Sequence, residues 1–185
     1  MKRLLITGGT GGLGSVVVPR LSREYECVLM RRDETPSIDG PLFGVVSLAG
    51  AFAGGSSTEA AQQMIEANLY SFTRALDLAS PHLEDGGRIV AISSAASLTQ
   101  PAALAAYAAS KSALNAYILT LAHELAPRRI TANALLPTAL ATAPMRAQMP
   151  DDKLVPLDRV AEWIAFLLSD NGAGVTGQLI KLEGR

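Results

Sequence analysis

Short apolar runs alternate with longer helical patterns along nearly the whole chain, and this alternation limits the fold more than any other feature of the sequence. The apolar runs have the length of strands, and the segments between them have the spacing of amphipathic helices. Neighbouring parallel strands need crossover connections, which such helices supply. The pattern therefore predicts an α/β protein built on a parallel sheet.

The predicted elements can be placed by residue range. Strands are expected at 3–7, 26–30, 44–48, 88–92, 131–136 and 178–182, and helices at 12–23, 58–79 (with a break allowed), 102–126 and 157–169. Residues 31–43 contain two prolines and a glycine, and they leave no room for a further helix and strand. We expect one domain over residues 1–185, with a Rossmann-like, doubly wound parallel sheet of about six strands.

Composition excludes several classes of protein. Of the 185 residues, 49% are hydrophobic and 18% are charged, which is not the composition of a disordered chain. The net charge is −1 and the basic residues are scattered, so no surface for nucleic acid or an anionic membrane is expected. Cys27 is the single cysteine, which excludes an internal disulfide and a multi-cysteine metal site. We expect a cytoplasmic protein without a metal or a membrane segment, acting on a small-molecule substrate.

A glycine-rich stretch, ITGGTGGLGS, follows the first predicted strand. Gly8, Gly12 and Gly14 are spaced so that a tight turn can bring a pyrophosphate close to the backbone. The helix that follows offers unpaired N–H groups and the positive end of its dipole. A glycine turn without a ligand is the alternative, but the position at the first strand–helix junction favours a dinucleotide site. Thr10 and Leu13 complete the expected cofactor-binding residues of this loop.

Arg31 and Arg32 follow the second predicted strand. In dinucleotide-binding folds an acidic residue at this place binds the ribose hydroxyls, whereas an arginine accommodates the 2′-phosphate of NADP. The arginines therefore favour NADP(H), and NAD(H) is the alternative cofactor. Two solvated charges at a strand end would explain the same residues, and Asp33 and Glu34 follow directly.

Tyr107 and Lys111 lie four positions apart in LAAYAASKSA and would share one face of a helix. A tyrosine has a pKa of about 10 and is a poor base at neutral pH. A positive charge about 4 Å away, at an effective dielectric constant near 20, is worth roughly 4 kcal/mol, which corresponds to about three pKa units. Lysine could thus bring the phenol into the working range of an acid or base. A chance pair on the helix surface is the alternative.

Two further polar residues strengthen this interpretation. Ser94 follows the predicted strand in GRIVAISS, at the end where ligands bind in open α/β sheets. Asn68 lies in the middle of a predicted helix, where asparagine is an indifferent helix former. We take Asn68, Ser94, Tyr107 and Lys111 as the candidate catalytic residues.

With these residues in place, the chain resembles the short-chain dehydrogenase/reductase family over nearly its full length. The matching segments are TGGTGGLG, LAGAFAGG, ISSAAS, YAASK, LLPTALATAPM and VTGQLIKLEG. The resemblance implies that Tyr107 donates a proton to a carbonyl oxygen as NADPH delivers hydride, and that Ser94 hydrogen-bonds this oxygen. It also implies that Lys111 lowers the pKa of the phenol and binds the nicotinamide ribose, and that Asn68 positions a water in a proton relay.

The resemblance also implies further cofactor contacts: Ala49 and Gly50 near the cofactor, and Pro137, Leu140 and Thr142 at its nicotinamide end. Three features depart from the family pattern. Asn-Asn-Ala-Gly is replaced by SLAG, and Pro-Gly is replaced by Pro137-Thr138. The third strand and its flanking helices are missing, which affects the adenine pocket. In this family, specificity is set largely by the segment after the sixth strand, here roughly 138–157.

Two other functions stay open. The segments AGAFAGG and LPTALATAPMR are similar to those of dihydropteridine reductases, which would make a quinonoid pterin the substrate. Those enzymes prefer NADH through an acidic residue where this chain has Arg32, and they typically lack the serine found at position 94. The other alternative is a cofactor-binding protein without activity, which the missing strand favours.

A homodimer or homotetramer is also expected. The alanine-rich faces of the helix at 102–126 allow close packing between helices. The family commonly dimerises through this helix and the one that carries Asn68. A protein that elutes only as a monomer in size-exclusion chromatography would contradict this expectation.

Overall fold

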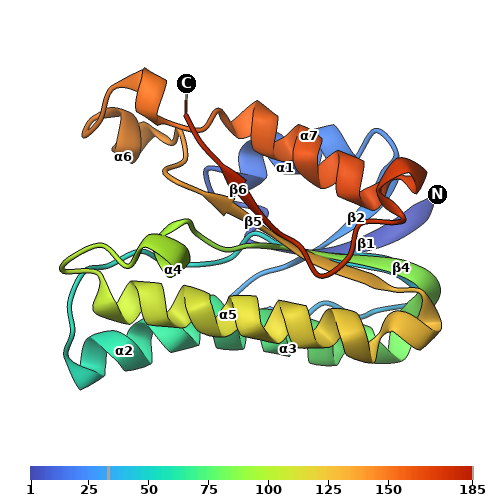
Figure 1. The fold of residues 1–185 in the computed structure, drawn as a ribbon. Helices are drawn as coiled ribbons and strands as arrows, with labels where there is room; N and C mark the ends of the chain where they lie inside the picture. Colours follow the sequence, from blue (N-terminus) through green and yellow to red (C-terminus); the bar gives the residue numbers. More distant parts are fainter. Residues whose placement is uncertain (33, 185) are drawn as a thin grey trace.

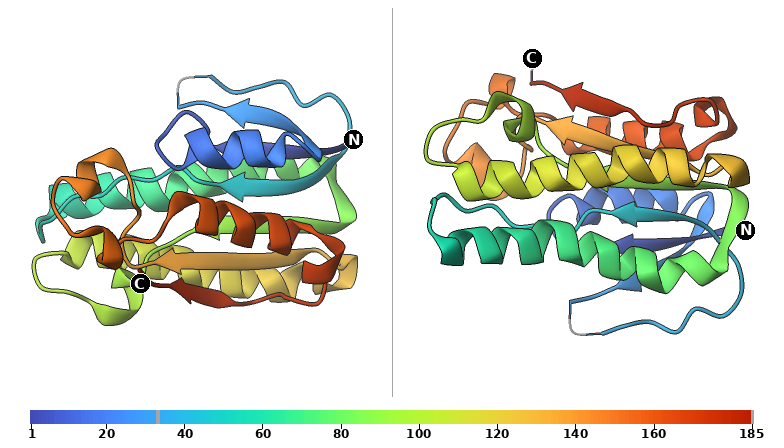
Figure 2. Two further views of the ribbon diagram at one scale, coloured as in Figure 1. Left: turned by 90° about the horizontal axis from the view of Figure 1, so that it is seen from above. Right: turned by 60° about the horizontal axis from the view of Figure 1, so that its bottom comes forward.

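The computed structural model describes residues 1–32 and 34–184. One parallel sheet has the strand order β2-β1-β3-β4-β5-β6. The strands are β1 (Lys2–Thr7), β2 (Tyr25–Met30), β3 (Leu42–Ser47), β4 (Leu83–Ile92), β5 (Thr131–Pro137) and β6 (Leu179–Leu182). Because all strands run the same way, their carboxyl ends share one edge of the sheet, toward which the arrowheads point (Figure 2).

Helices cover both faces of the sheet (Figure 1). One face carries α1 (Gly14–Leu21) and α7 (Leu157–Leu168), and the other carries α2 (Thr58–Ile65), α3 (Ser71–Ala79) and α5 (Ala105–Glu124). The short helices α4 (Ala96–Thr99) and α6 (Ala143–Arg146) lie at the carboxyl end of the strands. Among the described residues, no helix is both long enough and apolar enough to cross a membrane.

The side chains of each strand alternate between two buried clusters. Leu4 and Ile6 of β1 pack with α1 and α7, whereas Leu5 packs with α3 and α5, and all three are fully buried. Successive residues of a strand point to opposite faces, so a sheet covered on both sides needs continuous apolar runs. This explains why the strands could be found as short apolar segments.

The predicted fold class, a doubly wound parallel sheet of six strands, is confirmed. The connection from Met30 to Leu42 is a loop whose described residues contain one isolated bridge, between Arg31 and Glu34. The strand after the first helix, β2, lies at one edge of the sheet as expected. The third strand of the family is thus missing among the described residues, as predicted.

Several element ends differ from the prediction. The helix expected at 58–79 is divided by a π-helical turn, Glu66–Tyr70, between α2 and α3. The helix α1 begins at Gly14 rather than at residue 12, because the glycines before it form a turn. The helix α5 begins at Ala105 rather than at 102, because Ala103 has a φ of 65° and interrupts the helical path.

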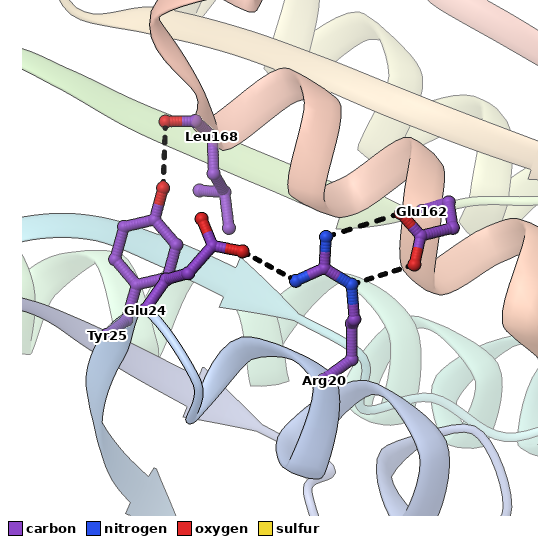
Figure 3. A network of polar contacts seen from close by, with 5 residues as sticks. All are labelled: Arg20, Glu24, Tyr25, Glu162 and Leu168. Carbon is purple, nitrogen blue, oxygen red and sulfur yellow. Dashed lines mark hydrogen bonds and ion pairs between the residues drawn. The ribbon is translucent and has the colours of Figure 1, made fainter.

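Arg20 joins α1 to α7 (Figure 3). Its Nε donates to Glu162 Oε1 at 2.7 Å, and its Nη1 donates to Glu24 Oε1 at 2.7 Å. Nearby, the Tyr25 hydroxyl donates to the Leu168 oxygen at 3.3 Å. Partly exposed ion pairs of this kind contribute about 1 kcal/mol or less each. Since α1 begins at the glycine loop, these contacts also help to fix the loop relative to the sheet.

Candidate active site

The parallel strands bring most of the predicted site residues to one edge of the sheet. In the strand register, Thr7 at the end of β1 pairs with Ser47 at the end of β3, and Ile92 at the end of β4 pairs with Leu135 of β5. The glycine loop, Ala49, Ser94 and the segment after β5 therefore follow neighbouring strand ends. This is the edge at which open α/β sheets bind ligands.

The glycine loop after β1 is a tight turn with little space for side chains. Gly8 has a φ of +70°, and a Cβ there would lie 2.5 Å from the Ala49 nitrogen. A Cβ on Gly14 would lie 2.4 Å from the Gly9 oxygen. The Gly11 nitrogen donates to the Gly8 oxygen at 3.1 Å and closes the turn. The conformation of this loop therefore depends on glycine.

The outer side of the loop is open and faces the segment after β5. Thr10, Gly11 and Gly12 are exposed. A Cβ on Gly12 would lie 3.3 Å from Thr142 Cγ2. Leu13, in contrast, is buried between the sheet, α1 and α7, so its side chain serves packing. The loop thus presents the main chain of Gly11 and Gly12 on its open side, next to the exposed Thr10.

Hydroxyl groups join the ends of β1 and β3, where the sequence departs from the Asn-Asn-Ala-Gly pattern. Thr7 Oγ1 lies 3.2 Å from Ser47 Oγ, and the Ala49 nitrogen donates to Thr7 Oγ1 at 3.3 Å. These contacts connect the ends of β1 and β3 beside the glycine loop. The two strand ends are therefore held together although Ser47 stands where the family pattern has asparagine.

Arg31 and Arg32 follow β2, whose last residue, Met30, pairs with Thr7 at the start of the glycine loop. Both arginines are exposed, and Arg31 forms an ion pair with Glu34 at 3.4 Å. An exposed pair of this kind holds the side chain only weakly. Asp33 lies outside the described residues.

A cavity of about 530 Å³ opens at the carboxyl edge of the sheet. Sites for small molecules commonly have roughly 300–1,000 Å³. Of the predicted site residues, the lining includes Gly50, Ser94, Tyr107, Lys111, Pro137, Leu140 and Thr142. Asn68 lies behind Gly50, and the glycine loop and the two arginines lie outside the cavity lining.

Tyr107 and Lys111 project from α5 into the same cavity, as their spacing predicted. The Tyr107 ring also contacts Phe52 edge to face, with 4.9 Å between the ring centroids. Phe52 is 63% exposed and belongs to the loop after β3, where it forms part of the cavity lining. The phenol therefore lies between the inner wall of the cavity and an aromatic residue at its edge.

The expectation that Lys111 lowers the pKa of the Tyr107 phenol stays a prediction, and two other influences on this phenol are visible in the structure. Burial raises the pKa of Tyr107, and the hydrogen bond with Ser94 opposes this rise. The Lys111 Nζ donates to the Ile92 oxygen at 2.9 Å. In this arrangement the contact with Ser94 favours the ionised phenol. The Lys111 ammonium donates to a main-chain carbonyl because a buried charge needs a hydrogen-bond partner.

Lys111 is almost fully enclosed by protein, with 4% of the residue exposed. Burial lowers its pKa from 10.5 to about 8. A Cβ on Gly50 would lie 3.2 Å from this Nζ and 2.7 Å from Asn68 Oδ1, so glycine leaves room for both groups. No carboxylate pairs with Lys111 among the described residues. At neutral pH the cavity wall therefore carries a positive charge.

Asn68 holds the loop after β3 against α5. Its Nδ2 donates to the Ala51 oxygen at 3.1 Å and to Ser110 Oγ at 3.0 Å, and its Oδ1 accepts from the Ala51 nitrogen at 2.9 Å. It lies in the π-helical turn and is 1% exposed. These contacts explain an asparagine in mid-helix on structural grounds, and its role in a proton relay stays a prediction.

A chain of buried hydrogen bonds supports Ser94 from behind. Asn115 Nδ2 donates to Ser97 Oγ at 2.7 Å, and Ser97 Oγ donates to the Ser94 oxygen at 2.6 Å. Because the Ser97 hydrogen is used toward Ser94, Asn115 must be the donor in the first bond. The Ser94 Oγ itself accepts from the Ala96 nitrogen at 3.2 Å. Its hydrogen is therefore free to point toward Tyr107 or a substrate oxygen.

Replacing Asn115 with leucine is expected to lower kcat by about tenfold, because a small misplacement of Ser94 weakens its action on the reacting groups. Loosening Ser94 should also move the pKa of Tyr107 upward, since the Ser94 hydrogen bond lowers it. The measurement is the pH profile of kcat for N115L beside N171L, a control on an exposed turn. An N115L profile that coincides with that of the control would contradict a positioning role for Asn115.

Several lining residues could not be assigned from the sequence. They are Phe52, Thr99, Leu104, Met145 and Lys181 among others. Phe52 and Met145 lie in the AGAFAGG and LLPTALATAPM segments, which carried a signal, whereas the direction of the other three side chains depends on the tertiary fold. Among the described residues, no group of histidine, cysteine, aspartate and glutamate side chains is arranged to hold a metal ion.

Comparison with known proteins places the chain in a family. A family model described as enoyl-(acyl carrier protein) reductase matches residues 41–184. An uncharacterized oxidoreductase of Bacillus subtilis is 32% identical, with 81% of this chain and 69% of that protein covered. The dihydropteridine reductase of Dictyostelium discoideum is 27% identical over 98% of this chain and 94% of that protein.

Other relatives are longer than this chain. An uncharacterized oxidoreductase of Methylorubrum extorquens is 34% identical over 66% of this chain. This match spans 55% of the Methylorubrum protein. A separate match, to a probable short-chain type dehydrogenase/reductase of Bradyrhizobium diazoefficiens, spans 40% of that protein. The chain thus spans about half the length of these curated relatives.

Solved structures share the fold. A short-chain dehydrogenase family protein from Francisella tularensis has a TM-score of 0.85 at 22% identity, with 100% of this chain and 98% of that chain covered. A blue fluorescent protein from a metagenomic library, in complex with NADPH, has a TM-score of 0.84 at 24% identity. The match covers 99% of this chain and 96% of that chain. By the family model over residues 41–184 and by its curated relatives, the chain belongs to the short-chain dehydrogenase/reductase family of oxidoreductases.

Proposed function

We propose that this protein transfers hydride between NADP(H) and the carbonyl or hydroxyl group of a small molecule, with NAD(H) as the alternative cofactor. The observation that carries the proposal is the placement of Ser94, Tyr107 and Lys111 on one cavity at the carboxyl edge of the sheet. Membership of an oxidoreductase family supports the reaction class. The NADPH complex of a structurally similar protein supports the cofactor.

The residues at the strand ends fit a dinucleotide. The glycine loop presents open main chain at Gly11 and Gly12, next to the first turn of α1. Helix N-termini and glycine turns of this kind bind pyrophosphate groups. Arg31 and Arg32 provide positive charge where an adenosine 2′-phosphate would be held. When bound, the nicotinamide ring would supply or accept the hydride at the substrate carbon.

The side chains in the cavity would handle the proton. Tyr107 would donate its phenolic proton to a substrate carbonyl oxygen, or accept it back in the reverse direction. Ser94, whose oxygen already accepts from the Ala96 nitrogen, would donate to the same substrate oxygen or to the phenolate. The Lys111 ammonium would bind ribose hydroxyl groups and keep positive charge near the developing phenolate. Asn68 would hold the loop after β3 in place through its two hydrogen bonds with the main chain of Ala51, which lines the cavity.

Reduction of a quinonoid pterin is a second candidate function. The match to the Dictyostelium dihydropteridine reductase covers nearly the whole of both chains. Phe52 supports a flat ring as substrate, because it is an exposed aromatic side chain that contacts Tyr107 at the cavity. A quinonoid dihydropterin therefore belongs among the substrates to be tested.

The direct test combines cofactor titration with turnover. Fluorescence titration with NADPH and NADH measures binding, and loss of NADPH absorbance with a panel of ketones, aldehydes and the quinonoid pterin measures reduction. Cofactor binding with turnover of at least one panel member is the expected result. Tight binding without turnover of any member would contradict the reductase function and favour a cofactor-binding protein.

Replacing Arg32 with alanine is expected to weaken NADPH binding about fivefold and to leave NADH binding unchanged, because an exposed charge pair contributes about 1 kcal/mol. The same titration measures both affinities, with R129A, on the turn before β5, as the matched arginine control. Equal loss of affinity for the two cofactors would show that Arg32 does not contact the 2′-phosphate that distinguishes them.

A further inference from the structure

We propose that the substrate carries an anionic end that Lys181 binds at the edge of the cavity; this inference rests on the proposed function and narrows its substrate class. The cavity lining contains two charged residues, Lys111 and Lys181, and no carboxylate. Both charges are positive. A cavity lined by one sign of charge favours ligands of the opposite sign.

The register of β6 directs Lys181 toward the catalytic side of the sheet. Lys181 pairs with Leu136 of β5, and parallel neighbours in register point to the same face. Leu136 packs in the cluster beneath α3 and α5, whereas Leu182, the next residue of β6, packs with α1 and α7. Lys181 therefore projects on the face covered by α5, the helix that carries Tyr107.

The two lysines differ in their availability to a ligand. Lys111 is enclosed, and its Nζ donates to the Ile92 oxygen. The Lys181 side chain is 42% exposed and forms an ion pair with Glu183 at 2.6 Å. The Glu183 side chain is 61% exposed and is not part of the cavity lining. Because exposed ion pairs are weak, a substrate anion can replace Glu183 as the partner of Lys181.

Apolar side chains line the rest of the cavity. They include Pro101, Leu104, Leu140 and Met145. The complementary substrate has a carbonyl or hydroxyl group at Tyr107, an apolar middle part, and an anionic group at Lys181. An ammonium is a point charge that binds carboxylate and phosphate alike, so both kinds of anion belong to the substrate class.

Two substitutions with opposite expected effects test this inference. K181Q is expected to lower kcat/KM for oxo-carboxylates about fivefold, because one exposed ion pair is lost. E183Q is expected to raise it severalfold, because Lys181 loses its competitor. The substrates are oxo-carboxylates with increasing numbers of methylene groups, the corresponding oxo-phosphonates, and the methyl esters of the oxo-carboxylates. The esters should show no change in either variant. K153Q, outside the cavity lining, is the control.

The outcomes separate this inference from the proposed function. If the panel is turned over and K181Q affects acids and esters equally, the proposal that Lys181 binds an anionic end of the substrate is overturned. The reductase function is then unaffected. If no compound is turned over, binding of an oxo-carboxylate and its ester to the NADPH-loaded protein is compared by saturation-transfer NMR. Preference for the acid that is lost in K181Q supports the site, and equal binding of acid and ester overturns it.

Discussion

Replacing Tyr107 with phenylalanine is expected to lower kcat by roughly 10²- to 10⁴-fold, the range that a positioned general acid contributes. The phenol lies in the cavity whose lining also includes Ser94, and its ring packs edge to face against Phe52. Phenylalanine keeps the ring and its contact with Phe52, so the variant removes little besides the oxygen and its proton. Cofactor affinity should therefore stay within a few fold of the wild-type value.

The measurements for Tyr107 are the rate of NADPH oxidation and the NADPH dissociation constant. The matched control is Y117F, because Tyr117 is exposed on the same helix and contacts Phe72 rather than the cavity. Loss of activity in both variants would indicate damage to α5 rather than loss of an acid. Near-normal turnover of Y107F would contradict the assignment of Tyr107.

The second large effect concerns the pH dependence of stability and the buried Lys111. Its pKa is lowered from 10.5 to about 8 by burial, so the folded protein releases this proton at a lower pH than the unfolded chain. Between these two pKa values the unfolded state binds more protons, and stability rises with pH. The cost of the buried charge is fully present below about pH 8 and is lost as the pH rises toward the pKa of the unfolded lysine.

Replacing Lys111 with methionine removes this pH dependence. From pH 7 to about pH 9.5 the unfolding free energy of the wild type should rise by about 2 kcal/mol relative to that of K111M. Urea unfolding of both proteins across this range measures the difference, and K153M, at an exposed lysine, should show none. A constant difference between wild type and K111M would show that Lys111 titrates normally. K111M should also lose activity, because the proposed ribose contact needs the ammonium.

The fold could be predicted because its central strands, β1, β3, β5 and the second half of β4, are largely buried on both faces. Each of these stands out as a short apolar run, and residues 31–43 are too few and too rich in proline and glycine to hold another helix and strand. The ends of the helices could not be placed in the same way. The turn at Gly11 and the positive φ of Ala103 shorten α1 and α5, and both depend on main-chain geometry that composition does not encode.

The candidate site was predictable where it follows from local spacing. Tyr107 and Lys111 share a cavity because they are one helical turn apart. The direction of the Lys111 ammonium was not predictable, because it depends on a carbonyl of β4 that is distant in sequence. The same holds for Lys181, whose face of the sheet is known only once the register with β5 is known.

The most direct test of the central claim follows the hydride and the proton together. The protein is given NADPH that carries deuterium at both positions of the hydride-carrying carbon of the nicotinamide ring, together with a ketone that it reduces. The expected product is an alcohol with deuterium on its carbinol carbon, formed rapidly by the wild type and very slowly by Y107F. An alcohol without deuterium, or labelled alcohol formed equally fast by Y107F, would contradict the central claim.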